Sequence, residues 1–130
     1  MTAKTLCMLF KQGEPAAPMR STARAALTPW HSADQIDDVL VVVSELVQNV
    51  SQHTEGGGTL VLNWDDHSIT VEVSDDDRRM PLQRPPDDQR LGGRGLLLVD
   101  GICSSWGATA HDHGKTVWAR VTPARMPVLA

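Results

Sequence analysis

The feature that most constrains the fold is a long stripe of apolar residues between positions 36 and 50. These residues recur at spacings of three and four, so in an α-helix they share one face. Ser32 and Gln35 have the spacing of a capping box, in which Ser caps the first turn and Gln reaches back to it. The glycines at 56–58 end the pattern. We therefore predict one helix with a continuous buried face, formed by Ile36, Val39, Leu40, Val43, Leu46, Val47 and Val50.

Shorter segments on both sides of this helix predict a sheet for it to cover. A helix is expected at 18–30, with Pro18 in its first turn and Pro29 at its end, and the spacing of Arg20 and Arg24 is typical of a solvated face. A short helix is expected after the glycines at 92–95. The order β-α-α-ββ-loop-α-ββ predicts a two-layer α/β (α+β) sandwich with helices on one face of a mostly antiparallel, mixed sheet. Its strands are expected at 4–10, 59–64, 68–74, 106–110 and 115–121.

Composition limits the class of protein. A chain of 130 residues is the length of one domain, and its formal net charge of -4 opposes binding to nucleic acid or to an anionic membrane surface. No apolar run approaches the roughly 20 residues of a membrane helix, and the N-terminal segment is a poor signal peptide. Cys7 and Cys103 form no CxxC motif. We therefore expect a reduced, cytoplasmic protein.

A polar ridge follows the predicted long helix. Glu45, Asn49 and His53 are four residues apart and point more than a right angle away from the apolar stripe. Val41 and Val42 precede Glu45 by one turn, which would place this carboxylate at the edge of a partly covered cavity. There Glu45 can act as a base, and the amide oxygen of Asn49 can bind a hard cation. The alternative interpretation is an ordinary solvated ridge.

Two further segments have residues that suit a nucleotide. The glycine-rich segment 92–95 precedes an apolar run, and main-chain amides at a helix start suit phosphate; a plain glycine turn is the alternative. Asp75 directly follows a predicted strand, where a carboxylate either accepts from an exocyclic amine or simply closes a turn. The segment 113–116 looks like the end of a P-loop. Thr109 stands where that loop needs glycine, and a strand follows, so we reject the motif.

Taken in order, these segments resemble the GHKL (Bergerat-fold) superfamily of ATP-binding domains. The resemblance spans about positions 6–121 and implies the histidine kinase-like ATPase fold. The chain would then be a single ATP-binding domain over 1–130, with a flexible lid at 76–90 and a tail at 123–130. The matching segments are the N box at 44–53 (SELVQNVSQH), the G1 strand at 71–75 (VEVSD), the G2 box at 92–99 (GGRGLLLV) and, at 114–118 (GKTVW), the closing strand of short bacterial relatives of anti-sigma-factor kinases.

The resemblance also implies roles for single residues. Asn49 would hold Mg²⁺ through its side-chain oxygen, with waters and the phosphates of ATP as the other ligands. Glu45 would be the general base in catalytic members. Asp75 would bind the adenine amine, and Thr116 would lie near the adenine end. The glycine segment would hold the phosphates through main-chain amides, and a lid arginine would contact the terminal phosphate; the residues concerned are Arg90, Gly93, Arg94, Gly95 and Leu96.

This sequence departs from the superfamily pattern directly after Asp75. The usual G1 pattern is Asp-x-Gly-x-Gly, but here Asp76, Asp77, Arg78 and Arg79 follow. Bulk and negative charge at position 77 oppose the close approach of a purine, which glycine normally allows. The lid arginines would in turn offset the charge of a triphosphate.

The resemblance implies an ATP- and Mg²⁺-binding regulator of the anti-sigma-factor type, acting as a serine/threonine kinase on an anti-sigma-factor antagonist. Its partners would be that antagonist or a sigma factor, and a second copy of the chain, because related kinases dimerise. The intact Glu45 and Asn49 pair favours the kinase. The altered G1 segment favours the alternative, a non-catalytic module that binds nucleotide weakly and sequesters a sigma factor or another regulator. A stand-alone nucleotide hydrolase is a third class.

Overall fold

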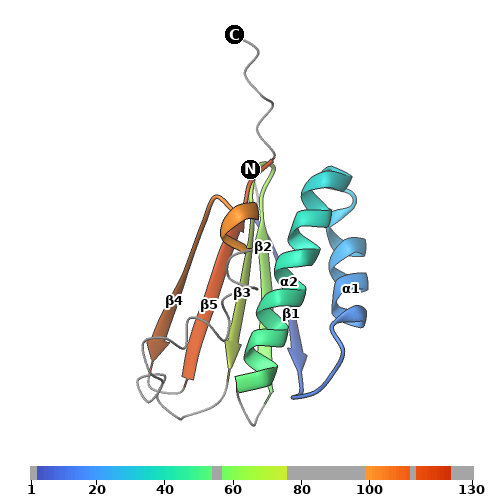
Figure 1. The fold of residues 1–130 in the computed structure, drawn as a ribbon. Helices are drawn as coiled ribbons and strands as arrows, with labels where there is room; N and C mark the ends of the chain where they lie inside the picture. Colours follow the sequence, from blue (N-terminus) through green and yellow to red (C-terminus); the bar gives the residue numbers. More distant parts are fainter. Residues whose placement is uncertain (1–2, 54–56, 76–98, 112–113, 124–130) are drawn as a thin grey trace.

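The chain folds into two layers, a five-stranded sheet and the helices that cover one of its faces (Figure 1). This computed structural model describes residues 3–53, 57–75, 99–111 and 114–123, and only the backbone at 50–53, 110 and 111. The predicted order of elements and the α+β class are confirmed. Residues 99–102 are helical, and the other elements are β1 (Lys4–Phe10), α1 (Ala17–Leu27), α2 (Ala33–His53), β2 (Gly58–Trp64), β3 (Ile69–Asp75), β4 (Ser105–His111) and β5 (Gly114–Val121).

The strands lie in the order β1-β2-β3-β5-β4. Every pairing between these described strands is antiparallel, so the parallel pair that a mixed sheet would require is not found in this part of the chain. Because β5 pairs with both β3 and β4, it brings the last hairpin alongside β3. As a result, the C-terminal end of β3 lies beside the start of β5.

The core lies between α2 and the helix-facing side of the sheet. The residues of β2 and β3 alternate between buried and half-buried, as the pleat of a half-covered sheet requires. The predicted stripe of α2 is buried from Ile36 to Val47, while the side chain of Val50 lies outside the described residues. Each aliphatic side chain buried in this way contributes about 1.5–3 kcal/mol to the stability of the fold, relative to the same side chain exposed to water. Burial of the stripe therefore dominates the attachment of α2 to the sheet.

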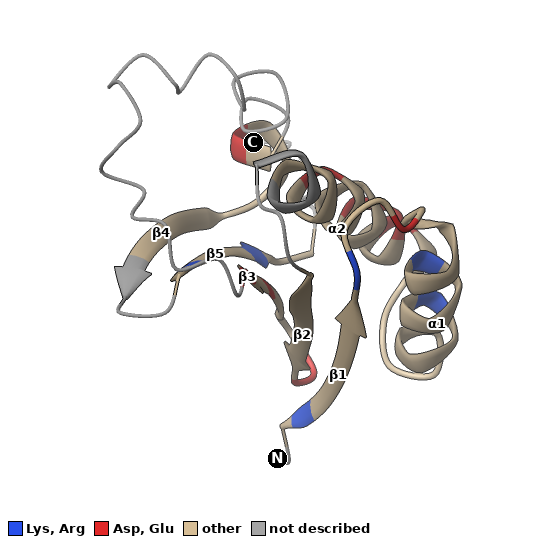
Figure 2. Cartoon of the chain, turned by 90° about the horizontal axis from the view of Figure 1, so that it is seen from below, with Lys and Arg blue, Asp and Glu red and all other residues tan. Residues whose placement is uncertain are grey.

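The buried face of α2 is wider than predicted. We expected Val42 to lie off the stripe beside the polar ridge, but its side chain has 0% exposure. The helical residues 99–102 lie beside α2, on the side away from α1 (Figures 1 and 2). Val99, within this short helix, also has 0% exposure. The sheet covers one side of α2 and the helical residues 99–102 lie against this flank. Val42 and Val99 therefore belong to the same buried cluster.

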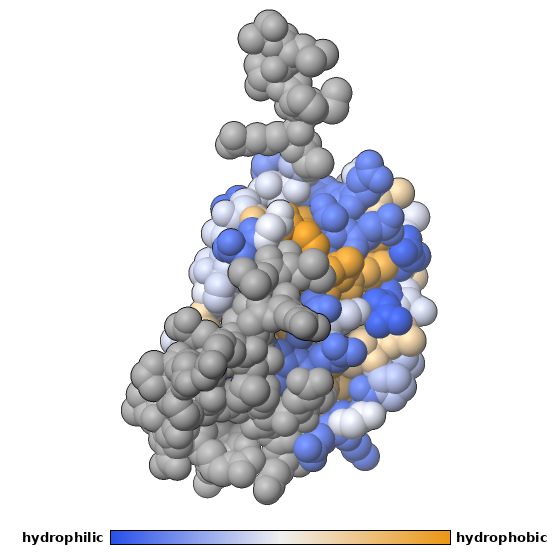
Figure 3. Space-filling view, viewed as in Figure 1, coloured by the Kyte–Doolittle hydropathy of each residue, from blue (hydrophilic) through white to orange (hydrophobic). Residues whose placement is uncertain are grey.

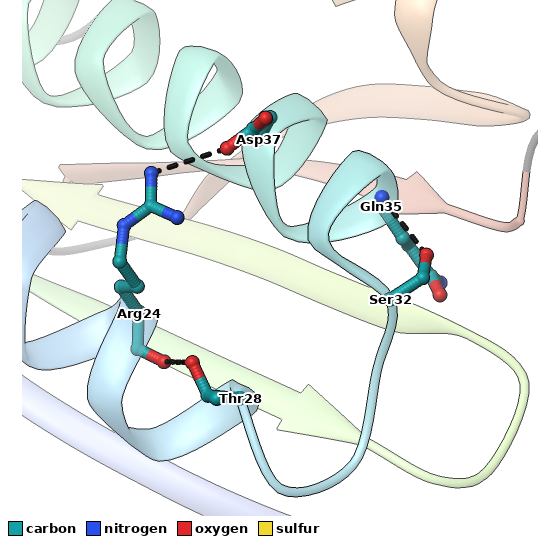
Figure 4. Close-up of polar contacts among 5 residues, drawn as sticks. All are labelled: Arg24, Thr28, Ser32, Gln35 and Asp37. Atoms are coloured by element: carbon teal, nitrogen blue, oxygen red, sulfur yellow. Dashed lines mark hydrogen bonds and ion pairs between the residues drawn. The ribbon is translucent and has the colours of Figure 1, made fainter.

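Helix α1 ends three residues earlier than predicted, at Leu27 instead of Trp30. Thr28 closes the last turn twice, because its main-chain N–H and its hydroxyl both donate to the carbonyl of Arg24, at 2.9 and 2.6 Å (Figure 4). Pro29 follows and has no N–H with which to continue the helix. The prediction placed the end at the proline, whereas the helix stops before it.

Half of the predicted capping box is confirmed. The Ser32 hydroxyl accepts from the Gln35 main-chain N–H at 3.2 Å (Figure 4). The prediction that the Gln35 side chain reaches back to the helix start is wrong. That side chain is 3% exposed and donates to the carbonyls of His67 and Val121, at 2.9 and 3.2 Å, while its oxygen lies 2.8 Å from Nδ1 of His31. Gln35 therefore joins the start of α2 to the turn between β2 and β3 and to the end of β5.

Replacing Gln35 tests this connection. In Gln35→Glu the two carbonyls lose their N–H donor and face a carboxylate instead, so we expect destabilisation by about 2 kcal/mol or more, the cost of buried polar groups without partners. Urea denaturation followed by circular dichroism measures the change. Gln48→Glu is the matched control, since Gln48 is exposed on the same helix and should change stability by less than about 0.5 kcal/mol. Equal effects of the two substitutions would contradict the assigned role.

The turn between β2 and β3 is held by Asp65. Its carboxylate accepts from the main-chain N–H groups of His67 and Ser68, at 2.8 and 2.9 Å. The Asp65 N–H donates in turn to the carbonyl of Ser68 at 3.1 Å. The hydrogen bonds from Ser68 and His67 favour the charged form and lower the pKa of Asp65 below its ordinary value. The turn residues predicted at Asp65 and Asp66 are thus confirmed, with a carboxylate as the stabilising group.

The lowered pKa of Asp65 gives a pH-dependent prediction. Because the folded-state pKa lies below the unfolded one, the carboxylate stabilises the fold above the unfolded pKa, and this contribution is lost as the pH falls through the folded pKa. Asp65→Ala should lower Tm at pH 7, and the difference from the unsubstituted protein should shrink in acid. The Tm of Asp65→Asn, which keeps an acceptor oxygen, should lie between those of Asp65→Ala and the unsubstituted protein. A Tm difference independent of pH, measured by calorimetry, would argue against this account.

Candidate functional site

The C-terminal end of α2 and the C-terminal end of β3 lie at the same end of the molecule (Figure 1). Glu45 and Asn49 are both half-buried near that end of α2. Asp75 is the last residue of β3. The sequence expectation placed it just after the strand. The structure therefore brings a helix carboxylate, a helix amide and a strand-end carboxylate to one end of the fold.

Glu45 borders a hollow between α1 and α2. Val41 and Ser44 line the hollow with it, together with Arg20 from α1. The expectation that Glu45 lies at a cavity edge was drawn from Val41 and Val42; of these, Val41 lines the hollow, whereas Val42 is buried in the core. Among the described residues, Glu45 makes no hydrogen bond or ion pair. A half-buried carboxylate at the edge of a hollow is a candidate for a general base.

The two arginines of α1 are placed differently from the solvated face that we predicted. Arg20 is half-buried, and its guanidinium donates to the hydroxyl of Ser44 at 2.9 Å. Arg24 pairs with Asp37 at 3.1 Å (Figure 4), with side chains that are 53% and 60% exposed. Both arginines therefore cross to α2, and only Arg24 has much contact with solvent. Figure 2 shows the same juxtaposition, with basic positions of α1 next to acidic positions of α2.

Asp75 is a buried carboxylate, only 4% exposed. The alternation of β3 places its side chain on the same face as Val71 and Val73, toward the helices. Its Oδ1 accepts from the main-chain N–H of Lys115 at 3.2 Å. An ionised carboxylate has about four acceptor sites, so this contact does not by itself prevent a further hydrogen bond to an amine. A carboxylate in this position suits the recognition of an exocyclic amine next to α2.

Thr116 lies on the other face of the sheet. It pairs with Ser74 in the register of β3 and β5, and the two hydroxyl oxygens are 2.9 Å apart. Since neighbouring strand residues alternate in direction, Ser74 and Asp75 leave the sheet on opposite faces. The structure thus separates the side chain of Thr116 from that of Asp75, although the resemblance assigned both to the adenine end.

The remaining predicted contacts to phosphate lie outside the described residues. They are the lid at 76–90 with Arg90 and the glycine segment with Gly93, Arg94, Gly95 and Leu96. The same holds for the side chain of His53 and for the tail at 124–130. These roles stay predictions.

The described residues suit a magnesium ion that takes few ligands from the protein. They contain no group of three His, Cys, Asp or Glu side chains able to hold a metal ion. Mg²⁺ commonly keeps several waters and shares the phosphates of a bound nucleotide, with one or two oxygen ligands from the protein. The half-buried amide of Asn49 can supply one such oxygen. Asn49 thus fits Mg²⁺ only if the phosphates are bound with the ion.

Sequence reasoning missed the contacts between α1 and α2. The sequence did contain a signal for these contacts. In two antiparallel helices the residue numbers increase in opposite directions, so later residues of one helix contact earlier residues of the other. Arg20 and Arg24 are one turn apart on α1, and their partners Ser44 and Asp37 are two turns apart on α2. Pairing opposite charges between the two predicted helices would have identified Arg24 and Asp37. Neutral Ser44 gave no comparable signal.

These features define a class of protein: a two-layer α+β domain whose helix amide and strand-end carboxylate lie at one end of the fold. Within that class, the chain belongs to the histidine kinase-like ATPase domain family, whose model matches residues 13–121. A comparison with curated proteins finds no match.

Membership in this family confirms that the chain belongs to the GHKL superfamily and has the fold expected from the resemblance. The protein is therefore an ATP-binding histidine kinase-like ATPase domain, of a superfamily whose members bind ATP with Mg²⁺ and act as ATP-dependent kinases or ATPases. In the described part of the chain, no helix has the length and apolar character needed to cross a membrane.

Asn49 offers a test of the metal site that leaves the fold intact. Its side chain lies off the buried stripe, so Asn49→Ala should change Tm little. If the amide oxygen is a magnesium ligand, the affinity for ATP in the presence of Mg²⁺ should fall by about tenfold or more. Isothermal titration with ATP measures it, and Gln48→Ala, at the exposed neighbouring position, is the control. Equal ATP affinity in Asn49→Ala and the unsubstituted protein would remove Asn49 from the metal site.

Proposed function

We propose that this domain is a regulator of the anti-sigma-factor type that transfers the γ-phosphate of ATP to a serine or threonine of an anti-sigma-factor antagonist. Membership in the family supports the use of ATP. The anti-sigma-factor role is supported by the order of the sequence motifs and by their likeness to the short bacterial kinases. A sigma factor is the second partner in this proposal, and a second copy of the chain is the third.

The observation that carries the catalytic proposal is the environment of Glu45. This carboxylate is half-buried at the edge of the hollow between α1 and α2, and it has no ion-pair partner among the described residues. Asn49, one turn further along the same helix, is also half-buried. A base and an amide at this spacing can act on opposite sides of one phosphate, which is the arrangement that phosphoryl transfer needs.

In the proposed reaction, Glu45 accepts the proton of the acceptor hydroxyl. The hydroxyl oxygen forms the new bond to the γ-phosphorus, while the bond from that phosphorus to the β,γ-bridging oxygen breaks and its electron pair leaves with ADP. Magnesium, when bound, neutralises charge on the phosphates. Asn49 would hold the ion and Asp75 would orient the base of the nucleotide, so the residues of the chain would contribute mainly position and charge.

The contact between Asp75 and Lys115 favours the second candidate function, a module that binds a regulator without catalysis. The Asp75 carboxylate already accepts a main-chain N–H, which gives it a structural role in joining β3 to β5. Two acidic residues follow it where the superfamily has a glycine-rich pattern. Weak nucleotide binding would leave the domain as a protein that sequesters a sigma factor or a related regulator.

Glu45→Gln separates the two functions. It removes the base and keeps the shape, so ATP binding should persist while transfer of radiolabelled phosphate to a candidate antagonist falls by about 10²- to 10⁴-fold. The matched control is Glu72→Gln, because Glu72 is a half-buried carboxylate on β3 that faces away from the helices. Transfer at the same rate in Glu45→Gln would exclude Glu45 as the base. Absence of transfer by the unsubstituted protein, with antagonist binding intact, would favour the non-catalytic module.

A further inference from the structure

The hollow beside Glu45 is one end of a longer groove between α1 and α2. A first lobe of about 600 Å³ and a second of about 530 Å³ share Arg20, Arg24 and Leu40 as walls. The first lobe extends to Thr28 and Pro29 at the end of α1. The second reaches Glu45. The first lobe therefore follows α1 along its length, and the second borders the proposed catalytic base.

Apolar side chains and guanidinium groups line this groove together. Leu40 and Val41 contribute the apolar surface on α2, and Pro29 contributes it beyond α1. Figure 3 shows apolar surface in the region of the two helices, bordered by hydrophilic residues. An occupant must therefore offer apolar side chains as well as groups that suit arginine.

The charged groups that line the groove are Arg20 and Arg24 on α1 and Asp37 and Glu45 on α2. Of these, Arg20 is the group that suits a carboxylate of the occupant. Arg20 is half-buried, but the partner it has among the described residues, the hydroxyl of Ser44, is neutral. A guanidinium has five N–H donors, and a carboxylate is the group that takes two of them at once. The Arg24 and Asp37 pair is exposed, and exposed pairs contribute little, so it can exchange partners. A carboxylate from outside would neutralise Arg20 at little cost.

We propose that this groove binds the acceptor segment of the partner protein, an acidic and apolar stretch that carries the serine or threonine to be phosphorylated. The inference rests on the proposed function and adds the residues that select the substrate. Arg20 and Glu45 line the same lobe of the groove. A segment whose carboxylate binds Arg20 would therefore place a neighbouring hydroxyl near Glu45. Arg20 is a positioning residue, because it acts on the substrate segment and not on the reacting atoms.

Peptide binding without nucleotide tests the groove alone. The probe is a fluorescein-labelled peptide in which one serine lies among leucines and glutamates, and its matched partner has lysines in place of the glutamates. Fluorescence anisotropy should show saturable binding of the acidic peptide, and Arg20→Glu should weaken it by roughly tenfold or more. Arg120→Glu is the control, since Arg120 is exposed on β5. The lysine peptide should bind Arg20→Glu more tightly than it binds the unsubstituted protein, a reversal that a misfolded variant cannot produce.

Several outcomes would overturn the proposal. They are equal binding of the acidic peptide by Arg20→Glu and the unsubstituted protein, equal binding of the two peptides by the unsubstituted protein, and no saturable binding of the acidic peptide. If Arg20→Glu instead converts a dimer to a monomer in sedimentation without affecting peptide binding, the occupant is a second copy of the chain.

Assays with ATP distinguish failure of the groove from failure of the proposed function. If peptide binding depends on Arg20 but no phosphate is transferred, the groove is a peptide-binding site and the proposed kinase activity is rejected. If Arg20→Glu transfers phosphate at an unchanged rate, the proposed kinase activity stands and the role of the groove in substrate binding is rejected.

Discussion

The structure depends on burial of one face of α2 against the sheet. This helix is the longest described element, and its aliphatic stripe is buried almost completely from Ile36 to Val47. Burial of apolar surface contributes about 25 cal/mol per Å², so this contact stabilises the packing of the helix layer on the sheet. It also fixes the rotation of the helix about its axis. Once the stripe faces the sheet, Glu45 must point away from the core and Asn49 must lie on the flank opposite α1.

That rotation gives α2 two different flanks. On one side, Val42 and the helical residues 99–102 close the core. On the other side, polar contacts between Arg20, Ser44, Arg24 and Asp37 leave a groove. Glu45 points outward between the two flanks and borders the hollow beside α1. The proposed role of Glu45 as a base for a protein substrate would use this position, because the phosphate donor and the hydroxyl would approach from different directions.

The features that were predictable from sequence are those set by short-range periodicity. The stripe of α2, the alternation of β2 and β3 and the turn at Asp65 each follow from residues a few positions apart. The features that were missed depend on long-range partners. Gln35 bonds to carbonyls 32 and 86 residues away, so the capping box looked complete from sequence although its second half was wrong. The early end of α1 is a local exception, since Thr28 closes the helix before Pro29 can break it.

The positions of the predicted site residues also depend on long-range partners. The strand predicted at 68–74 ended one residue before Asp75, so the face of Asp75 follows from the observed extent of β3, and the face of Thr116 follows from the register of β5 against β3. A shift of one residue in that register would have turned Thr116 toward the helices. In the observed register its hydroxyl contacts Ser74, and Lys115 supplies a main-chain N–H to the Asp75 carboxylate. The strand β5 therefore contributes to this end of the fold through its backbone, because the Lys115 N–H fixes the Asp75 carboxylate on the helix-facing side of the sheet. In the proposed function, this is the carboxylate that would meet the adenine amine.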